Sequence, residues 1–366
     1  MLRVVQWATG GVGKAAIEAV RQHPELELAG CYVHSADKAG KDVGEILGID
    51  PLGVVATNEV EDILALDADA VVYAPLVPDP DEVARILRSG KNVVTPVGWF
   101  YPSERDTALE QACLDGGVSL HGTGINPGGT TELHPLVLSA MTSAVTYVRS
   151  EEFSDMRTYN APDVLRWVMG FGGTPDEARK SPMLKVLSGG YRQSVRMCLD
   201  TLGIADAQIR SSHEIAVATA PIDSPLGVID AGSVAAQRFS WDAVVGDRVV
   251  VRIAVNWLMG EKNLEPAWEF GPGGERYEIE VKGDPDTFVT IHGWQPASVA
   301  EGLRRNPGIV ATANHCVNSI PYVVAAEPGI RTCLDLPPVA GRAHPDLLAG
   351  RAEPSLPTVT GRRDRP

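Results

Sequence analysis

The chain has 366 residues, of which 44% are hydrophobic and 22% charged, enough for two or three domains with a substantial apolar core. Lys and Arg number 32 against 47 Asp and Glu, so the net charge is −15, which argues against nucleic acid or an anionic membrane surface as a partner. No apolar run approaches the roughly 18 residues of a membrane span, so we expect no membrane insertion.

Cysteine usage favours a reducing compartment. The five cysteines lie far apart and form no CxxC pair, which indicates buried free thiols and not a disulfide framework or a zinc site: Cys31, Cys113, Cys198, Cys316 and Cys333. The first residues lack the charged and apolar regions of a secretion signal. We therefore expect a cytoplasmic protein without a bound metal.

The first 125 residues alternate between short apolar runs and helical stretches. Strands are expected at Leu2–Trp7, Leu26–Val33, Ala70–Ala74, Asn92–Val97 and Val118–His121. Helices are expected at Lys14–Gln22, Asp81–Ser89 and Ser103–Asp115. Apolar strands separated by helices are typical of a doubly wound parallel sheet, so residues 1–125 are predicted to form a Rossmann dinucleotide-binding domain.

The pattern changes after Asn126, where the β segments lengthen and alternate between polar and apolar residues. They are Ala144–Glu152, Ser211–Ala218, Ser233–Asp242, Asp247–Val255, Arg276–Lys282 and Thr287–Ile291. Helices are expected at Ala161–Met169, Met183–Leu202, Ala297–Arg305 and Ile309–Ala326. Such alternation predicts a sheet with one covered face. We expect an α+β substrate and dimerisation domain with a mostly open sheet over 126–300, a helical return onto the first domain over 301–338, and a tail over 339–366.

The turn after the first strand, Trp7-Ala8-Thr9-Gly10-Gly11-Val12-Gly13-Lys14, is similar to the dinucleotide fingerprint with Ala8 in place of the first glycine. Gly10 would let the backbone approach a pyrophosphate, and Gly13 would let the helix pack closely on the strand. The phosphates would bind N–H groups at the helix N-terminus. The predicted cofactor contacts here are Thr9, Gly10, Gly11, Val12 and Gly13; the alternative is an ordinary glycine-rich turn.

The end of the second strand bears on the choice between NAD and NADP. An NAD site places an acid there to hold the ribose hydroxyls, but Asp37 comes slightly late. The hydroxyl and ammonium groups nearby suit a 2′-phosphate, so we predict NADP, with NAD possible. The predicted contacts are His34, Ser35, Lys38 and Lys41, and the alternative is a solvated loop.

Two later loops follow strands of the same sheet and should border the nicotinamide. They contain Ala74-Pro75 and Gly122-Thr123-Gly124-Ile125-Asn126-Pro127-Gly128. Ligands of such sheets bind at the carboxyl ends of the strands. We predict contacts from Ala74, Pro75, Asn126 and Pro127, with Asn126 hydrogen-bonding the carboxamide. The second loop also serves as a Gly/Pro linker to the second domain.

Several segments together resemble the 2,4-diaminopentanoate dehydrogenase and native amine dehydrogenase family, which is related to dihydrodipicolinate reductases. They are VVQWATGGVGK, SADKAGKDVGE, GKNVVTPVGWFYP, GTGINPG, MGFG and NSIPYVVAAEPGIRTCLDLP, and they span about residues 2–338. The resemblance implies NAD(P)H-dependent interconversion of a small ketone or aldehyde plus ammonia with an amine, in a homodimer. Hydride would pass between the nicotinamide C4 and an imine carbon.

In that family a carboxylate that handles protons and ammonium follows the GKNVVT strand. Here the stretch from Thr95 to Pro102 contains no acid, which departs from the family pattern. Glu104 is the nearest carboxylate and is the predicted catalytic residue. Ser103 and Asp106 around it are similar to a capping box, so the alternative is a charge at the start of a helix.

Further candidates follow in the second domain. Glu132 and His134 come after the GTGINPGG loop, and Glu151, Glu152 and Asp155 precede Tyr159. One of these last acids could bind a substrate amine, although a solvated strand edge is the simpler interpretation, and His292 is expected to be structural. The predicted substrate pocket contains Trp99, Phe100, Glu132, Tyr159, Trp167 and Met169, for which a core role is the alternative.

The leading hypothesis is an NADP-preferring amine dehydrogenase-like oxidoreductase. One alternative is a dihydrodipicolinate reductase-type imine reductase, although the HHxxK segment of that enzyme has no counterpart here. The other is a catalytically inactive NADP-binding sensor, suggested by the acid missing after GKNVVT.

Overall fold

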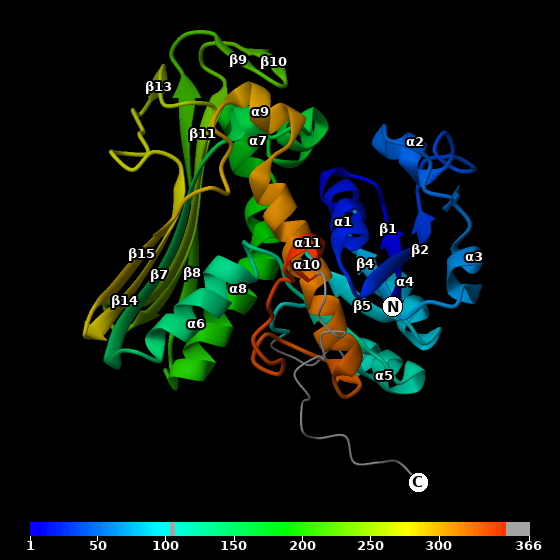
Figure 1. Cartoon of the computed structure of the whole chain (residues 1–366). Coiled ribbons are helices and arrows are strands. Elements are labelled where there is room, and N and C mark those ends of the chain that lie inside the picture. Colours follow the sequence, from blue (N-terminus) through cyan, green and yellow to red (C-terminus); the bar gives the residue numbers. More distant parts are fainter. Residues whose placement is uncertain (103–106, 349–366) are drawn as a thin grey trace.

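The computed structural model describes residues 1–102 and 107–348. Within them, two seven-stranded sheets lie on either side of a set of helices, as Figure 1 shows. Helices α6 (His134–Ser139), α8 (Met183–Leu202) and α10 (Pro307–Ala325) run between the sheets. The polypeptide passes from the first sheet to the second and returns, because its last strand joins the first sheet.

The first sheet is entirely parallel, with the order β16-β6-β5-β4-β1-β2-β3. Its strands are β1 (Leu2–Trp7), β2 (Leu26–Tyr32), β3 (Ala56–Thr57), β4 (Ala70–Tyr73), β5 (Asn92–Thr95), β6 (Ser119–Gly122) and β16 (Gly329–Ile330). Every residue of β4, β5 and β6 is buried, which explains why β4 is a continuous apolar run in the sequence. The predicted Rossmann sheet is confirmed.

Helices cover both faces of this sheet: α1 (Gly11–Gln22), α2 (Val43–Leu47), α3 (Val60–Ala65), α4 (Pro80–Arg88) and α5 (Thr107–Gly116). Helix α4 begins as its sequence predicts, because Asp79 accepts hydrogen bonds from the first-turn amides and Pro80 follows. The sequence analysis did not predict α2, α3 or β3. Each is six residues or shorter and relies on contacts with distant segments for its stability.

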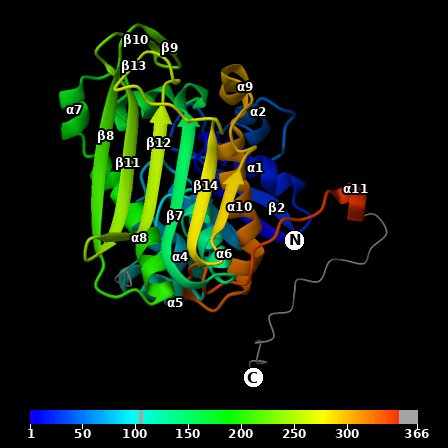
Figure 2. The same cartoon turned by 90° about the vertical axis from the view of Figure 1, so that its left-hand side faces the viewer.

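The second sheet is mixed, with the order β13-β8-β11-β12-β7-β14-β15 and only β12 and β7 parallel. Its strands are β7 (Ser143–Asp155), β8 (Gln208–Ala218), β11 (Val234–Val245), β12 (Arg248–Leu258), β13 (Leu264–Glu265), β14 (Arg276–Asp284) and β15 (Thr287–Ile291). One face packs on α6 and α8, and the other faces away from the rest of the chain, as Figures 1 and 2 show. The predicted α+β arrangement with an open sheet is confirmed.

Smaller elements complete the second half of the chain. A hairpin of β9 (Ile222–Ser224) and β10 (Gly227–Ile229) and helix α7 (Pro175–Lys180) lie at one end of the second sheet. The helix predicted at Ala161–Met169 is present, and its centre is a π-helical turn at Val164–Val168. The neighbouring glycines Gly170 and Gly172 adopt positive φ and prevent a longer helix.

The segment after the second sheet returns to the first sheet. After α9 (Val299–Arg304), helix α10 lies beside α1, and Cys316, Val317 and Ile320 share an apolar core with Val4 of β1. Then β16 pairs with β6, and α11 (Pro345–Leu348) ends the described chain. The limits proposed for the four segments, 1–125, 126–300, 301–338 and 339–366, stay a prediction.

Candidate functional site

The turn between β1 and α1 is held by close backbone packing. Ala8 adopts a left-handed φ of 72°, and a Cβ on Gly13 would overlap the carbonyl oxygen of Ala8. The side-chain amide of Gln6 donates to that same carbonyl at 3.0 Å. Gly13 is therefore required for the close contact between strand and helix that the sequence predicted.

Gly10, three residues before Gly13, has open space around it and no close contacts. A Cβ added to Gly10 would meet no atom within 4 Å, and its φ of −71° suits any residue. Helix α1 starts there without a side-chain cap, so the amides of its first turn are not occupied by a side chain. Open space beside a bare helix N-terminus fits the pyrophosphate of a dinucleotide.

The loop after β2 brings one of its two lysines back to the turn. Lys38 Nζ donates to Thr9 Oγ1 at 3.2 Å, whereas Lys41 pairs with Glu45 at 3.5 Å. Ser35 donates to Asp37, and the His34 ring stacks edge-on against Tyr32 with the ring centroids 5.1 Å apart. Of the two predicted lysines, the structure places Lys38 at the turn.

The two later loops lie at the carboxyl edge of the same sheet. The amide of Ala74 donates to the carbonyl of Trp7 at 3.1 Å, and Pro75 is buried beside it. The loop after β6 contains a cis Asn126–Pro127 bond and is tight, because a Cβ on Gly128 would overlap the backbone of Gly124. The side chain of His315 on α10 hydrogen-bonds the Gly124 carbonyl at 2.7 Å.

The first turns of α10 link these two parts of the site. A Cβ on Gly11 would lie 3.3 Å from Ile309, and one on Gly124 would lie 3.5 Å from Thr312. Because Ile309 and Thr312 are successive on one face of α10, the dinucleotide turn and the Asn126 loop are neighbours in space.

A buried carboxylate, Glu152, faces the Asn126 loop from β7. One of its oxygens accepts a hydrogen bond from Asn126 Nδ2, and the other accepts from Ser154 Oγ at 2.7 Å and Trp257 Nε1 at 3.2 Å. Burial raises the pKa of Glu152, while these three donors lower it. Burial, and after it the charge of Glu152, raises the pKa of Tyr191 and Tyr277, so both phenols lie near this carboxyl group.

Glu132 is also fully buried, but on a different side of the loop. It belongs to a π-helical turn at Gly129–Leu133 and accepts a hydrogen bond from Thr131 Oγ1. Burial raises its pKa. Beside it, the His134 ring stacks on Trp294 and its Nδ1 is buried without a partner, and burial lowers the pKa of this histidine.

The predicted pocket residues are only partly brought together. Phe100 is buried where the loop after β5 meets α8, since a Cβ on Gly190 would lie 3.3 Å from both Phe100 and Pro127. Trp99 adopts a positive φ on the core of the first sheet. Tyr159 and Met169 pack on the core of the second sheet, and Trp167 is 78% exposed.

The remaining acidic and histidine candidates are separated. Glu104, the predicted catalytic residue, lies outside the described residues. Glu151 points to the open face of the sheet, opposite to Glu152, and Asp155 pairs with Arg157 at 2.5 Å. His292 is exposed.

The sequence analysis missed four side chains of this region, namely Ser154, Tyr191, Trp257 and His315. Each comes from a different segment, so no local motif contains two of them. The alternation of β7 places Ser154 and Glu152 on one face, and from this alternation Ser154 could have been predicted as a neighbour of Glu152.

Two surface cavities lie elsewhere. One of about 580 Å³ opens between α7, α8 and β8, and one of about 430 Å³ opens beside β2 and β3. Among residues 1–102 and 107–348, no group of three or more His, Cys, Asp or Glu side chains could hold a metal ion. Within the same ranges, no helix has the length and apolar character to cross a membrane.

The fold and the turn define a Rossmann-type dinucleotide-binding protein, and its similarity to known proteins makes it an NAD(P)-dependent oxidoreductase. Residues 4–75 match the N-terminal family of dihydrodipicolinate reductases, and residues 133–345 match the 2,4-diaminopentanoate dehydrogenase C-terminal domain. The chain is 34% identical to an amine dehydrogenase of Streptomyces virginiae, covering 93% of this chain and 98% of the relative.

The particular family follows from these matches: the chain belongs to the amine dehydrogenase and 2,4-diaminopentanoate dehydrogenase family, as its motifs indicated. It is also 24% identical to a 2,4-diaminopentanoate dehydrogenase of Acetoanaerobium sticklandii over 92% of this chain and 93% of that one. The fold is that of an amine dehydrogenase from Mycobacterium smegmatis, with a TM-score of 0.73 at 22% identity over 93% of this chain and 97% of that one. The expected enzyme class, an NAD(P)-dependent oxidoreductase acting on CH–NH2 groups, is confirmed at the level of this family.

Proposed function

We propose that this enzyme interconverts a small ketone or aldehyde plus ammonia with the corresponding amine. The observation that carries the proposal is the placement of a buried carboxylate, Glu152, at the Asn126 loop, which α10 joins to the dinucleotide turn. A bound nicotinamide exchanges hydride at C4 with the imine carbon. The residues of the chain bind the cofactor, orient the imine and exclude water.

The Asn126 loop is well suited to a reaction that needs a dry site. Trp257, Tyr191 and Tyr277 are all buried around Glu152, and Phe100 and Pro127 close the side towards α8. An iminium carbon hydrolyses in water, so excluding water protects it until hydride arrives. This lining supports a small and fairly hydrophobic substrate.

Glu104 stays the proposed catalytic carboxylate. It follows the β5 loop, whose Tyr101 amide donates to Gln193 of α8 at 2.9 Å, so the segment before it is anchored beside the site. If Glu104 transfers protons, Glu104→Gln should lower kcat about 100-fold with little change in cofactor affinity. Unchanged turnover would assign the role to a carboxylate of the second domain.

We propose NADP as the preferred cofactor, because Lys38 bonds Thr9 at the turn where a 2′-phosphate would lie. NAD is also compatible with this loop. The Asp37 carboxylate accepts a hydrogen bond from the Ser35 hydroxyl, and it could accept from the ribose hydroxyls of NAD in place of Ser35. A lysine near the ribose favours the dianionic phosphate through charge.

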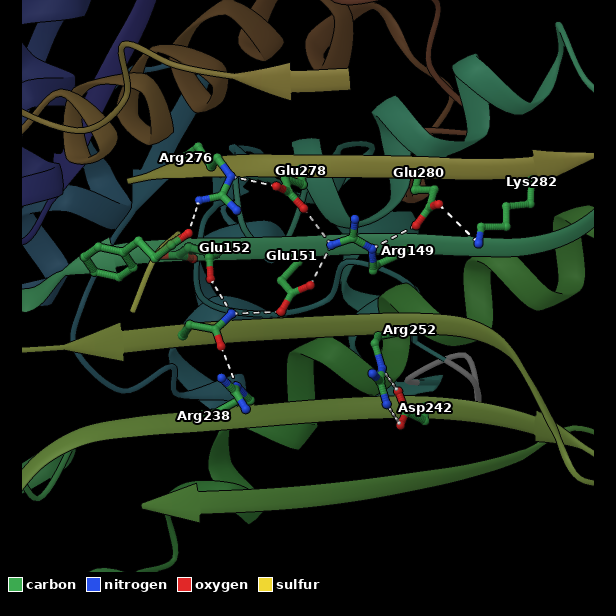
Figure 3. A network of polar contacts seen from close by, with 12 residues as sticks. Arg149, Glu151, Glu152, Arg238, Asp242, Arg252, Arg276, Glu278, Glu280 and Lys282 are labelled. Atoms are coloured by element: carbon green, nitrogen blue, oxygen red, sulfur yellow. Dashed lines mark hydrogen bonds and ion pairs between the residues drawn. The ribbon is translucent and has the colours of Figure 1, made fainter. Parts of the chain in front are cut away.

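We also propose a homodimer formed through the open face of the second sheet. Figure 3 shows the polar network there, centred on Arg149, which pairs with three glutamates at 2.6–3.1 Å. Five cations and five acids of this face pair with one another, so their charges cancel on a chain of charge −15: Arg149, Arg238, Arg252, Arg276 and Lys282 with Glu151, Glu214, Asp242, Glu278 and Glu280. A neutral face lets two copies approach without repulsion.

The exposed Phe288 at the edge of this face tests the dimer. It is 56% exposed, with Arg149 over its ring. Light scattering should give twice the chain mass for the wild type and a reduced dimer fraction for Phe288→Asp. A monomeric wild type would refute the proposal.

A dihydrodipicolinate reductase activity is less well supported. A 4-hydroxy-tetrahydrodipicolinate reductase of Synechococcus elongatus is 43% identical over only 63 residues, 17% of this chain. That similarity covers the cofactor-binding part alone, which many chemistries share.

The decisive experiment measures turnover by absorbance of the reduced nicotinamide. The enzyme should oxidise small alkyl amines with NADP and reduce the matching ketones with ammonium and NADPH. Tight NADP binding without turnover over a broad panel of amines and ketones would favour the sensor alternative.

A further inference from the structure

The amide of Asn126 is fixed at one end and unsatisfied at the other. Its Nδ2 donates to Glu152, whereas its Oδ1 is buried and has no hydrogen-bond partner among residues 1–102 and 107–348. The backbone around it is also held, because the Tyr191 hydroxyl donates to the Asn126 carbonyl at 3.5 Å. The position of this side chain is therefore set by its surroundings.

The hydrogen bonds that Glu152 makes determine which end of the Asn126 side-chain amide faces it. Every hydrogen-bond partner it has within the described residues is a donor: Asn126, Ser154 and Trp257. In the structure Asn126 turns its NH2 group towards Glu152, which is the arrangement that a carboxylate accepting from all three partners requires. The carbonyl oxygen of the amide then has to point the other way.

A buried carbonyl oxygen without a donor is uncommon in folded proteins, because it has lost its water without gaining a partner. Asn126 lies in the loop after β6, at the carboxyl edge of the first sheet, where ligands of such sheets bind. A ligand that brings an N–H group would satisfy this oxygen.

We propose that Glu152 is a positioning residue, which holds the Asn126 amide with its oxygen towards the ligand so that the site selects an N–H donor. This inference rests on the proposed function. Two sources share that chemistry, the carboxamide of the nicotinamide and the nitrogen of the amine or imine substrate. Glu152 acts through Asn126 in either case and touches neither.

The neighbouring Glu151 provides a matched control. It precedes Glu152 on the same strand but points to the open face, where it pairs with Arg149 at 2.6 Å. Glu151→Gln and Glu152→Gln make the same chemical change 3–4 Å apart along the chain. Only the second faces the ligand-binding edge.

The experiment uses the full chain and compares the binding of NADP+ with that of its 3-acetylpyridine analogue, in which a methyl ketone replaces the carboxamide and removes the N–H. The thionicotinamide analogue, which keeps an NH2 group, is the reference. The measured quantity is the ratio of the affinity for NADP+ to the affinity for the acetylpyridine analogue. If the carboxamide is the donor, this ratio should be about fivefold higher in the wild type and in Glu151→Gln than in Glu152→Gln. A glutamine can donate or accept, so it no longer fixes the amide.

If the substrate nitrogen is the donor, the cofactor ratios stay equal, and the KM for the amine rises about fivefold in Glu152→Gln with little change in kcat. Equal cofactor ratios and equal KM values in Glu151→Gln and Glu152→Gln would overturn the proposal.

A second variant covers the case that Glu152→Gln does not fold. Asn126→Ser keeps Glu152 and replaces the amide by a shorter hydroxyl, which no longer carries an acceptor to the position of Oδ1, so it should lose the same discrimination. Retention of the wild-type discrimination in Asn126→Ser would also overturn the proposal. The binding ratios need no turnover, so an inactive wild type would refute the proposed function while these ratios could still be measured.

Discussion

In the cofactor half of the candidate site, one continuous segment, residues 7–14, sets the geometry through its backbone. In the substrate half, Asn126, Glu152 and Trp257 come from a loop and two strands, and side-chain hydrogen bonds join them. The first half depends on glycines that leave space or permit close packing. The second depends on a buried charge whose every partner is a donor.

The difference explains how each half would respond to mutation. A backbone turn has few alternative shapes, so one added methyl group either clashes or is tolerated. A buried polar cluster loses its orientation when one member changes, because the others are left unsatisfied. The predictions below test this contrast from the largest expected effect to the smallest.

Gly13→Ala should be the most damaging change in the cofactor half. The added Cβ would overlap the carbonyl oxygen of Ala8 and lie 3.1 Å from the Gln6 amide nitrogen that donates to the same carbonyl. We expect the free energy of unfolding to fall by about 3 kcal/mol, measured by urea denaturation. An unchanged midpoint would show that strand and helix are not packed as closely as the structure indicates.

Gly10→Ala should separate binding from folding. Its backbone angles suit alanine and its Cβ meets no atom of the chain, so stability should change by less than about 0.5 kcal/mol. The methyl group would occupy the space next to the pyrophosphate, and NADP affinity should fall about tenfold in a fluorescence titration. Wild-type affinity in this variant would place the pyrophosphate elsewhere.

The same contrast explains what the sequence could and could not predict. The dinucleotide turn was recognised because all its determinants lie within eight residues, and buried strands such as β4 were placed correctly by their apolar runs. The surroundings of Glu152 were not recognised, because its partners Asn126 and Trp257 are 26 and 105 residues away along the chain. The alternation of β7 showed only that Glu151 and Glu152 face opposite sides.

A change at Glu275 probes the buried acids of the substrate half. Glu275 accepts the amide of Asp155 at 2.7 Å, and burial raises its pKa to about 7, to which the Asp155 charge also contributes. A carboxyl whose folded pKa exceeds its unfolded value destabilises the protein as pH rises through the range between the two values, here from about 4.5 to about 7.

Glu275→Gln should therefore be more stable than the wild type at pH 8, by about 1 kcal/mol after allowing for partial exposure, and no more stable at pH 5. Thermal unfolding of both proteins at the two pH values measures this. A variant that is less stable at pH 8 would show that the carboxylate is stabilising in its charged form.

The smallest effect is expected at Lys38, where the cofactor half relies on a side chain and not on the backbone. Lys38 reaches Thr9, whereas Lys41 pairs with Glu45, so the two lysines form a matched pair of variants. Lys38→Ala should lower the preference for NADP over NAD about threefold to fivefold, because an exposed ion pair contributes only about 1 kcal/mol or less. Lys41→Ala should leave the ratio of the two affinities unchanged. If both variants bind the two cofactors as the wild type does, the choice of cofactor depends on the backbone and Asp37, and the cofactor half would then need neither lysine.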